Sequence, residues 1–391
     1  MKRILSTLAL GLAIFGSLQA QELTNFSFWG QKPIISPEIQ NDSVTFRLKA
    51  DYATIVKLSG SWMPNPWGGT IDMTRGENNV WSVKIPLPAP EIYTYNFVVD
   101  GVAVNDPQNV LVQRDGTRYL PMLLVPGERT ENYGEANRHG TVSHPWYTSK
   151  ILGMDRRLTV YTPCGYENNP KKKYPVLYLL HGAGGDEEAW TSMGRTAQIL
   201  DNLIEKGLAE PMIVVMPNGN ANQAAARTLN ISEKPMPNRW DREAFEKLSE
   251  AERDLLMNGY VRSLCTEIVP FIEKNFRAIP KPASRAIAGL SMGGGHTISA
   301  SILYPELFDY ICPLSAAGSA TPEQIATLKK AGVKLYFLAC GNTDFLFQGA
   351  EEMHAKLLEQ GLEHEYFVSD GGHVWSNWRL YLNTFAQKLF K

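Results

Sequence analysis

The residues best suited to do chemistry form a serine-centred pattern in the C-terminal half of the chain. Ser291 lies in the sequence Gly-Leu-Ser-Met-Gly at residues 289–293, directly after an apolar run and before the helix-like segment 297–307. A strand, a tight turn flanked by glycines and a helix are the elements of a nucleophile elbow, which presents a serine hydroxyl above a sheet. The N–H groups at the start of the helix favour negative charge beside that hydroxyl. Ser291 is therefore the candidate nucleophile.

The candidate base is a histidine, because a serine hydroxyl is a weak nucleophile until a neighbouring base takes its proton. Sites built on a nucleophile elbow carry first the acid and then the histidine after the serine. His354 falls inside a helical pattern and His364 at the start of the last predicted strand, so both are expected to be structural or solvated. His373 lies in a glycine-containing loop after that strand, which makes it the candidate base.

The candidate acid is Asp344, which follows the apolar strand-like run 335–339 at the right place in that order. Its expected task is to hold one ring nitrogen of His373 and to stabilise the imidazolium. Asp370 is the alternative, because it is close to His373 in sequence, although it lies on the loop of the histidine itself. Asp309 is expected to be a surface turn residue.

Backbone N–H groups are expected to hold the oxyanion that forms when an ester is attacked. The glycine-rich loop 181–185 follows a strand-like run, and the Ala183 N–H is the first candidate donor, with Gly182 as an alternative. The second donor is the N–H of Met292, the residue after the nucleophile. His181 is expected to fix this loop rather than to transfer protons. The reaction would run through an acyl-enzyme without a metal or an organic cofactor.

The elements around these residues predict an α/β fold, with a mostly parallel sheet covered by helices on both faces. Apolar runs of strand length alternate with helix-period stretches such as 261–276 and 347–359. The polar segment 221–256 is expected to be an insertion above the sheet, and its Trp240 is a candidate wall of the substrate pocket. The predicted strands are 176–180, 212–216, 286–290, 310–314, 334–339 and 366–368.

The N-terminal part has a different pattern, which predicts a small all-β, immunoglobulin-like sandwich. Short alternating stretches rich in β-branched and aromatic residues recur between 44 and 125, separated by turn residues. The polar stretch after them lacks an apolar pattern and is predicted to be a linker. The predicted organisation is a sandwich over 21–126, a linker over 127–140 and a catalytic α/β domain over 141–391.

Composition and the first residues bear on location and partners. The 391-residue chain has a formal net charge of −2, so nothing in its charge favours nucleic acid. Residues 1–20 begin with Lys2 and Arg3, continue with an apolar run and end at Ala20, as a secretory signal does. The protein is therefore expected to be secreted or periplasmic, with no stable membrane insertion after signal cleavage. Its four cysteines form no Cys-x-x-Cys pair, which argues against a zinc site and leaves their disulfide state open.

The C-terminal domain resembles the esterase-D-like family (carbohydrate esterase family 1) of the α/β-hydrolase fold, which includes feruloyl and acetyl xylan esterases. The resemblance covers 141–391 and implies that Trp375 binds substrate. Siderophore esterases and mycolyltransferases are also similar, so the likeness is less specific to substrate. The motifs that carry it are residues 180–185 and 288–294, Cys340-Gly341 with Asp344, and Gly371-Gly372-His373 with Trp375.

The N-terminal domain is similar to the family 48 carbohydrate-binding modules, and residues 93–101 and 106–107 carry the likeness. Ala103 stands where that family has a glycan-stacking Trp, so this position does not support starch or glycogen binding. Trp62 and Trp67 lie in a loop-like stretch, where they could bind a glycan, shape the esterase pocket or serve structure alone. Trp81 alternates with strand residues and is expected in the core.

Together these patterns predict an exported serine esterase that releases ferulate or acetate from feruloylated or acetylated plant polysaccharide such as arabinoxylan. Two alternatives stay open. One is a siderophore esterase of the enterobactin type, which keeps the chemistry and changes the substrate. The other is a glycan-binding protein without catalytic activity.

Overall fold

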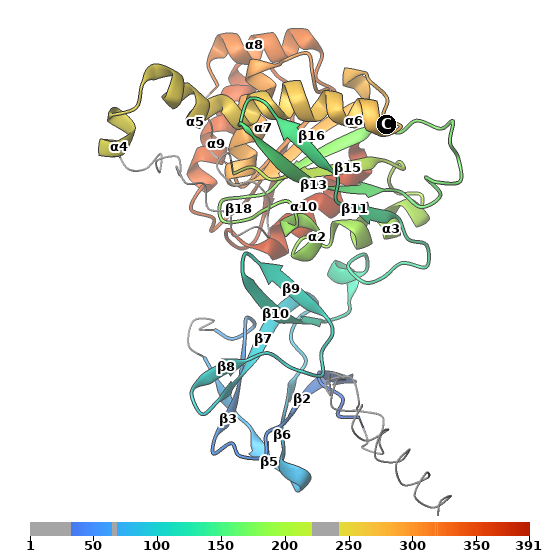
Figure 1. Cartoon of the computed structure of the whole chain (residues 1–391), viewed down its shortest axis with the longest axis vertical. Helices are drawn as coiled ribbons and strands as arrows, with labels where there is room; N and C mark the ends of the chain where they lie inside the picture. The colour runs from blue at the N-terminus through green and yellow to red at the C-terminus, as the bar shows by residue number, and fades with distance from the viewer. Residues whose placement is uncertain (1–32, 65–68, 221–241, 317, 319) are drawn as a thin grey trace, which may run out of the picture.

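The computed structural model describes residues 33–64, 69–220 and 242–391, except 317 and 319, and shows two domains in contact (Figure 1). The expected signal segment 1–20, Trp67 and Trp240 lie outside the described residues. Across the described ranges, no helix is both long enough and apolar enough to cross a bilayer.

The N-terminal domain consists of two antiparallel sheets that share one core. The first has the order β1-β2-β6-β5, and the second β4-β3-β7-β10-β9, with β8 pairing β7. Alternate residues of β2 and β7 point inward, among them Phe46 and Phe97, which are fully buried. The predicted all-β sandwich is confirmed. Its strands are β1 (Glu38–Gln40), β2 (Ser43–Lys49), β3 (Val56–Gly60), β4 (Ile71–Asp72), β5 (Thr74–Arg75), β6 (Val80–Pro86), β7 (Ile92–Val99), β8 (Val102–Val104), β9 (Val112–Asp115) and β10 (Arg118–Leu124).

Two tryptophans singled out in the sequence belong to the packing of the sandwich. Trp81 is buried, as predicted, and its indole Nε1 donates a hydrogen bond to the Ala50 carbonyl at 3.2 Å. Trp62 stacks on Phe46 with ring centroids 5.6 Å apart and meets Tyr93 edge-on at 5.9 Å. Among the described residues, both ring contacts of Trp62 lie within the domain, so Trp62 packs against the core of the sandwich.

The segment 127–140, predicted to be a linker, packs against the second domain. Tyr133 is fully buried in the core of the second domain. Arg195 donates a hydrogen bond to the Tyr133 carbonyl at 3.0 Å, and Asn202 donates one to the Gly134 carbonyl at 2.9 Å. Backbone carbonyls of the segment thus accept hydrogen bonds from the second domain. Composition alone cannot distinguish this from hydrogen bonds to water. The connection between the domains is packed.

The C-terminal domain is built on a nine-stranded sheet in the order β11-β13-β15-β14-β16-β17-β18-β19, with β12 pairing β13. The strands from β15 to β19 pair in parallel, whereas β11, β12 and β13 are antiparallel. The predicted mostly parallel sheet is confirmed. The strands are β11 (Thr141–Ser143), β12 (Trp146–Ser149), β13 (Met154–Thr162), β14 (Val176–Leu180), β15 (Ile213–Pro217), β16 (Arg285–Leu290), β17 (Tyr310–Leu314), β18 (Leu335–Gly341) and β19 (Glu365–Ser369).

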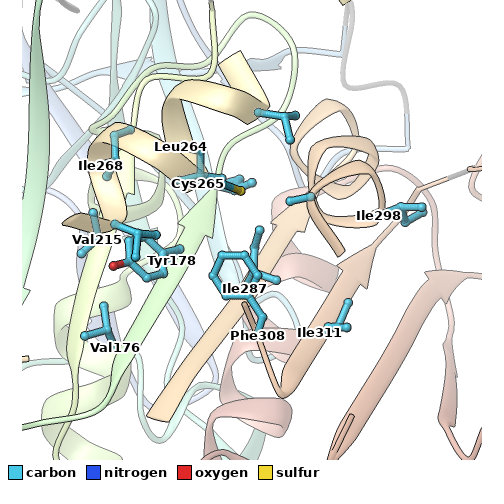
Figure 2. Close-up of a cluster of buried hydrophobic side chains, with 14 of the residues drawn as sticks. Val176, Tyr178, Val215, Leu264, Cys265, Ile268, Ile287, Ile298, Phe308 and Ile311 are labelled. Carbon is cyan, nitrogen blue, oxygen red and sulfur yellow. The ribbon is translucent and has the colours of Figure 1, made fainter. Parts of the chain in front are cut away.

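Helices cover both faces of this sheet, because its central strands are apolar on both sides. Figure 2 shows one of the two cores, where Tyr178 and Val215 of the strands pack beneath Leu264 and Ile268. The other core lies under α3 and α10. The helices are α2 (Ala189–Ser192), α3 (Thr196–Glu205), α4 (Arg242–Glu246), α5 (Glu250–Ser263), a π-helical turn (Leu264–Ile268), α6 (Val269–Asn275), α7 (Met292–Leu303), α8 (Pro322–Ala331), α9 (Phe347–Glu359) and α10 (Trp375–Phe385).

The helix after Ser291 begins earlier than its sequence suggests. The predicted segment 297–307 is in fact α7, which starts at Met292 and ends at Leu303. Three consecutive glycines in its first turn have poor helix propensity, and they hid that turn from the sequence interpretation. In the predicted insertion 221–256, the described residues form α4 and the start of α5.

Candidate active site

Ser291 occupies a strained turn between β16 and α7, as a nucleophile elbow requires. Its backbone has φ 54° and ψ −115°, a conformation that costs a non-glycine residue about 1–3 kcal/mol. The Ser291 N–H donates to the Leu314 carbonyl of the neighbouring β17 at 2.9 Å, which holds the turn against the sheet. A side chain at Gly289 would collide with the Gly293 carbonyl, so the approach of strand and helix requires glycine there.

Asp344 and His373 are hydrogen-bonded to each other. The His373 Nδ1 lies 2.9 Å from Asp344 Oδ2 and 3.0 Å from Oδ1. The two residues follow β18 and β19, which are adjacent parallel strands, so their loops emerge at the same edge of the sheet. The Asp344 side chain is fully buried, whereas that of His373 is 20% exposed. His373 also lines the cavity, so its imidazole can be reached from there while its Nδ1 is held by the Asp344 carboxylate.

The environment of Asp344 favours its charged form. Burial alone raises the pKa of this carboxyl, but hydrogen bonds from His373, the Leu346 N–H and Ser315 outweigh it. The net pKa of Asp344 is below its ordinary value. A buried carboxylate that stays charged can hold the Nδ1–H tautomer of His373 and stabilise an imidazolium.

The alternative residues are engaged elsewhere. The Asp370 carboxylate accepts a hydrogen bond from Asn342 at 2.8 Å and is exposed. His354 and His364 pair with each other at 2.7 Å. Their positions on α9 and before β19 match a structural role, as expected from the sequence.

A cavity of about 600 Å³ brings most of the candidate residues together. Ser291, His373, Ala183 and Trp375 all line it, and Met292 follows Ser291 as the first residue of α7. The volume is within the range of about 300–1,000 Å³ that is usual for small-molecule sites. The remaining lining residues are Ser61, Glu91, Ile92, Tyr93, Thr94, Gln113, Asp115, Leu120, Gly182, Gly185, Ala189, Met193, Leu290, Val374, Ser376, Trp378 and Arg379.

The glycine-rich loop after β14 approaches the nucleophile closely. A Cβ atom on Gly182 would lie 3.2 Å from the Cβ of Ser291, so a larger residue would crowd the serine. His181 is buried and accepts a hydrogen bond from the Gly219 N–H at its Nε2, at 2.7 Å. Its Nδ1 therefore carries the proton and donates to the Gly182 carbonyl at 2.7 Å. These bonds anchor the loop whose Ala183 N–H is the first candidate oxyanion donor.

Aromatic rings surround the imidazole. Trp378 meets His373 edge-on with centroids 5.0 Å apart, and Trp375 contacts both Trp378 and Trp190 at 5.1 and 5.3 Å. The Trp378 indole donates to the Ser315 hydroxyl at 3.0 Å, which fixes its orientation. The sequence analysis missed Trp378. Trp378 lies three residues after Trp375 on α10, and this spacing is the signal that could have placed both rings on one helix face.

Two clusters of buried charge join the sandwich to the loops of the site. Arg114 of β9 donates to Asp186 at 2.6 Å and to Glu188 at 3.2 Å, just beyond the glycine-rich loop. On the other side, Arg379 of α10 donates to Glu91 at 2.9 Å. The side chains of Arg114 and Arg379 are almost fully buried. Each guanidinium charge therefore depends on a carboxylate from the other domain to offset the cost of its burial. The sequence analysis found neither cluster.

The described residues contain no group of three or more His, Cys, Asp or Glu side chains that could hold a metal ion. All four cysteines are free thiols, which answers the question that the sequence left open.

Comparison with known proteins places this geometry in a family. Residues 149–331 match the family model described as putative esterase. The endo-1,4-beta-xylanase/feruloyl esterase of Xylanibacter ruminicola is 32% identical over 333 residues, which is 83% of this chain and 42% of that protein. The C-terminal domain belongs to this esterase family. Members of the family are carboxylic ester hydrolases, and the C-terminal domain is called the esterase domain below. The chain spans less than half the length of that relative, whose alignment is longer than the esterase domain and so includes part of the sandwich.

Solved structures share the fold. A ferulic acid esterase aligns with 65% of this chain and all of its own, at 28% identity and a TM-score of 0.50. The enterobactin esterase of Shigella flexneri aligns with 93% of this chain and 98% of its own, at 17% identity and a TM-score of 0.61. The second alignment extends over both domains, so the two-domain architecture recurs in a distant protein.

Proposed function

We propose that the protein is an exported serine esterase that hydrolyses ferulate or acetate esters of plant cell-wall polysaccharide. The observation that carries the chemistry is the Asp344–His373 hydrogen bond beside a cavity that Ser291 also lines. Membership of the esterase family supports ester hydrolysis. The xylanase/feruloyl esterase relative supports the substrate, and the signal-like residues 1–20 support export.

In the proposed reaction, the His373 Nε2 takes the proton of the Ser291 hydroxyl as its oxygen attacks the ester carbonyl carbon. The negative charge moves to the carbonyl oxygen, which the N–H groups of Ala183 and Met292 stabilise. The alcohol leaves with the proton from the His373 imidazolium, and the acyl group stays on Ser291. Water, deprotonated by His373, then releases the acid, while Asp344 remains charged throughout.

The lining of the cavity supports an acyl group with an aromatic ring. Trp375, Trp378 and Leu290 surround the reacting groups with apolar surface. Flat rings pack favourably against indole edges and faces. A feruloyl group has such a ring, whereas an acetyl group would leave much of the 600 Å³ unfilled. Ferulate esters are therefore the preferred substrates within the proposal.

A siderophore esterase is the second candidate, because the two-domain fold recurs in the enterobactin esterase. Catecholate siderophores are acidic and bind iron as anions, so their sites benefit from cationic side chains. Among the described lining residues, Arg379 is the one Lys or Arg, and it pairs with Glu91. The charge of the cavity thus favours a neutral aromatic ester over a catecholate.

Two measurements test the proposal. A fluorophosphonate probe should label Ser291 in the folded protein and should fail to label the Ser291→Ala variant. Hydrolysis of feruloylated arabinoxylan, acetylated xylan and enterobactin should then rank in that order by kcat/KM. If the folded wild-type protein is not labelled, the proposed esterase activity is contradicted and a glycan-binding role remains. If Ser291 is labelled but enterobactin is cleaved faster than either xylan, the proposed polysaccharide substrate is contradicted.

A further inference from the structure

The cavity at Ser291 is closed on one side by the sandwich. Thr94 of β7, Gln113 of β9 and Leu120 of β10 line it together with residues of the esterase domain. Figure 1 shows β9 and β10 at the end of the sandwich that meets α2 and α10. The site is therefore assembled from both domains.

Strand register shows that these side chains point toward the esterase domain. Met122 pairs with Thr94 across β10 and β7, and Leu120 pairs with Gln113 across β10 and β9. Directly paired residues, and residues two apart on one strand, share a face of a sheet. Met122 is part of the buried cluster of the esterase domain. Thr94, Gln113 and Leu120 consequently belong to that same outward face.

The position of this wall is held by the two buried charge clusters. Arg114 lies next to Gln113 on β9 and reaches Asp186 beyond the glycine-rich loop. Glu91 precedes β7 and reaches Arg379 on the helix that follows His373. One cluster thus ties the wall to the oxyanion side of the site, and the other ties it to the histidine side.

Gln113 is a polar group with unused hydrogen-bonding capacity. Its residue is only 5% exposed, and its side chain makes one hydrogen bond within the described residues, a 3.7 Å contact to the Met122 sulfur. A carboxamide offers two N–H donors and an oxygen that accepts twice, and a thioether is a weak acceptor. Gln113 lines the cavity, and its amide atoms are not among the fully buried side-chain atoms of the described residues that lack a partner, so a ligand or water can complete its hydrogen bonds. The amide is thus suited to bind a polar group of the substrate.

The buried character of the cavity favours the acyl group as its occupant. Gln113, Met193, Leu290 and Trp378 are each at least nine-tenths buried. A polysaccharide chain continues in both directions and needs an open path, whereas an aromatic acyl group is compact and ends within the cavity.

We propose that the sandwich selects the acyl group of the substrate, with Gln113 hydrogen-bonding a hydroxyl or methoxy substituent on an aromatic ring that packs against Leu120. This inference rests on the proposed function and adds a specificity-determining role for the N-terminal domain. The geometry that carries it is a nearly buried amide that β9 places in the lining of the cavity that Ser291 also lines.

The test compares methyl ferulate with methyl cinnamate, which lacks the ring substituents. Replacement Gln113→Met keeps the length of the side chain and removes the amide. It should lower kcat/KM for methyl ferulate about five- to tenfold, the value of one hydrogen bond, and leave methyl cinnamate within about twofold. The ratio of the two substrates in one preparation does not depend on the folded fraction. If Gln113→Met does not fold, Gln113→Leu allows the same comparison.

The matched control is Gln108→Met, which makes the same change at an exposed position of the same domain. It should leave the ferulate-to-cinnamate ratio unchanged. Equal losses on both esters, or no loss on either, would overturn the role of Gln113 while labelled Ser291 still supports the esterase. A wild-type Ser291 that resists the fluorophosphonate probe would overturn the proposed function, and this inference with it.

Discussion

The two walls of the cavity are built in different ways. The esterase wall consists of loops at the ends of parallel strands, where Ser291 and Asp344 follow the buried strands β16 and β18 and His373 follows the edge strand β19. The sandwich wall is the face of a sheet, where alternate residues such as Gln113 and Leu120 point outward. The first wall carries the reacting groups, and the second limits what can reach them. Reactivity is thus local to strand ends, whereas selectivity depends on how one domain docks on the other.

The largest effect is expected on the esterase wall. Ser291→Ala removes the nucleophile and should lower kcat by about 10⁶-fold, because the rest of the machinery acts through that oxygen. Initial rates with methyl ferulate measure the loss, and equilibrium binding of the ester should survive it. Residual turnover within tenfold of wild type would show that another group attacks the ester.

A loss of about 10⁴-fold in kcat is expected for Asp344→Asn, because the amide would favour the wrong tautomer of His373. Asp370→Asn makes the same change on the neighbouring loop, and its kcat should stay within about twofold of wild type. Steady-state kinetics of the two variants side by side decide between the carboxylates. A large loss of kcat for Asp370→Asn and a small one for Asp344→Asn would identify Asp370 as the acid.

The docking of the two walls can be broken at Glu91. Glu91→Ala leaves the guanidinium of Arg379 buried without its partner, which should cost about 3–5 kcal/mol of unfolding free energy. Asp72→Ala removes an exposed ion pair with Lys57 in the same domain and should cost less than about 1 kcal/mol. Denaturant titration of both variants measures the difference. Equal costs would mean that the interdomain cluster does not hold the sandwich in place.

A smaller effect concerns the loop behind the oxyanion site. Burial lowers the pKa of His181 below its ordinary 6.5, so the unfolded chain binds a proton that the folded protein does not. Stability should therefore fall as pH drops below about 6.5, by at most about 1.4 kcal/mol per pH unit from this group. His181→Gln should flatten that dependence in denaturant titrations from pH 5 to 8. If the unfolding free energies of the variant and the wild type depend on pH in the same way, His181 is not the source of the dependence.

The sequence was informative where function is local. Strand, glycine turn and helix identify Ser291 without a structure, and parallel strand order places Asp344 and His373 at one edge. The sandwich wall was out of reach, because alternation in 93–99 predicts a strand without saying which face another domain covers. The same limit hid Arg114 and Arg379, whose partners are far away in sequence. The packing of residues 127–140 was hidden for the same reason, since partners such as Arg195 and Asn202 are also far away in sequence.

The central claim is that an ester reacts at Ser291 in a cavity shared by both domains. A crystal structure of the Ser291→Ala variant with methyl ferulate tests it directly. The ester carbonyl carbon is expected about 3–3.5 Å from the position of the missing hydroxyl, with the aromatic ring between Trp375 and the Gln113 amide. An ester bound with its ring away from the sandwich, or outside the cavity, would contradict it.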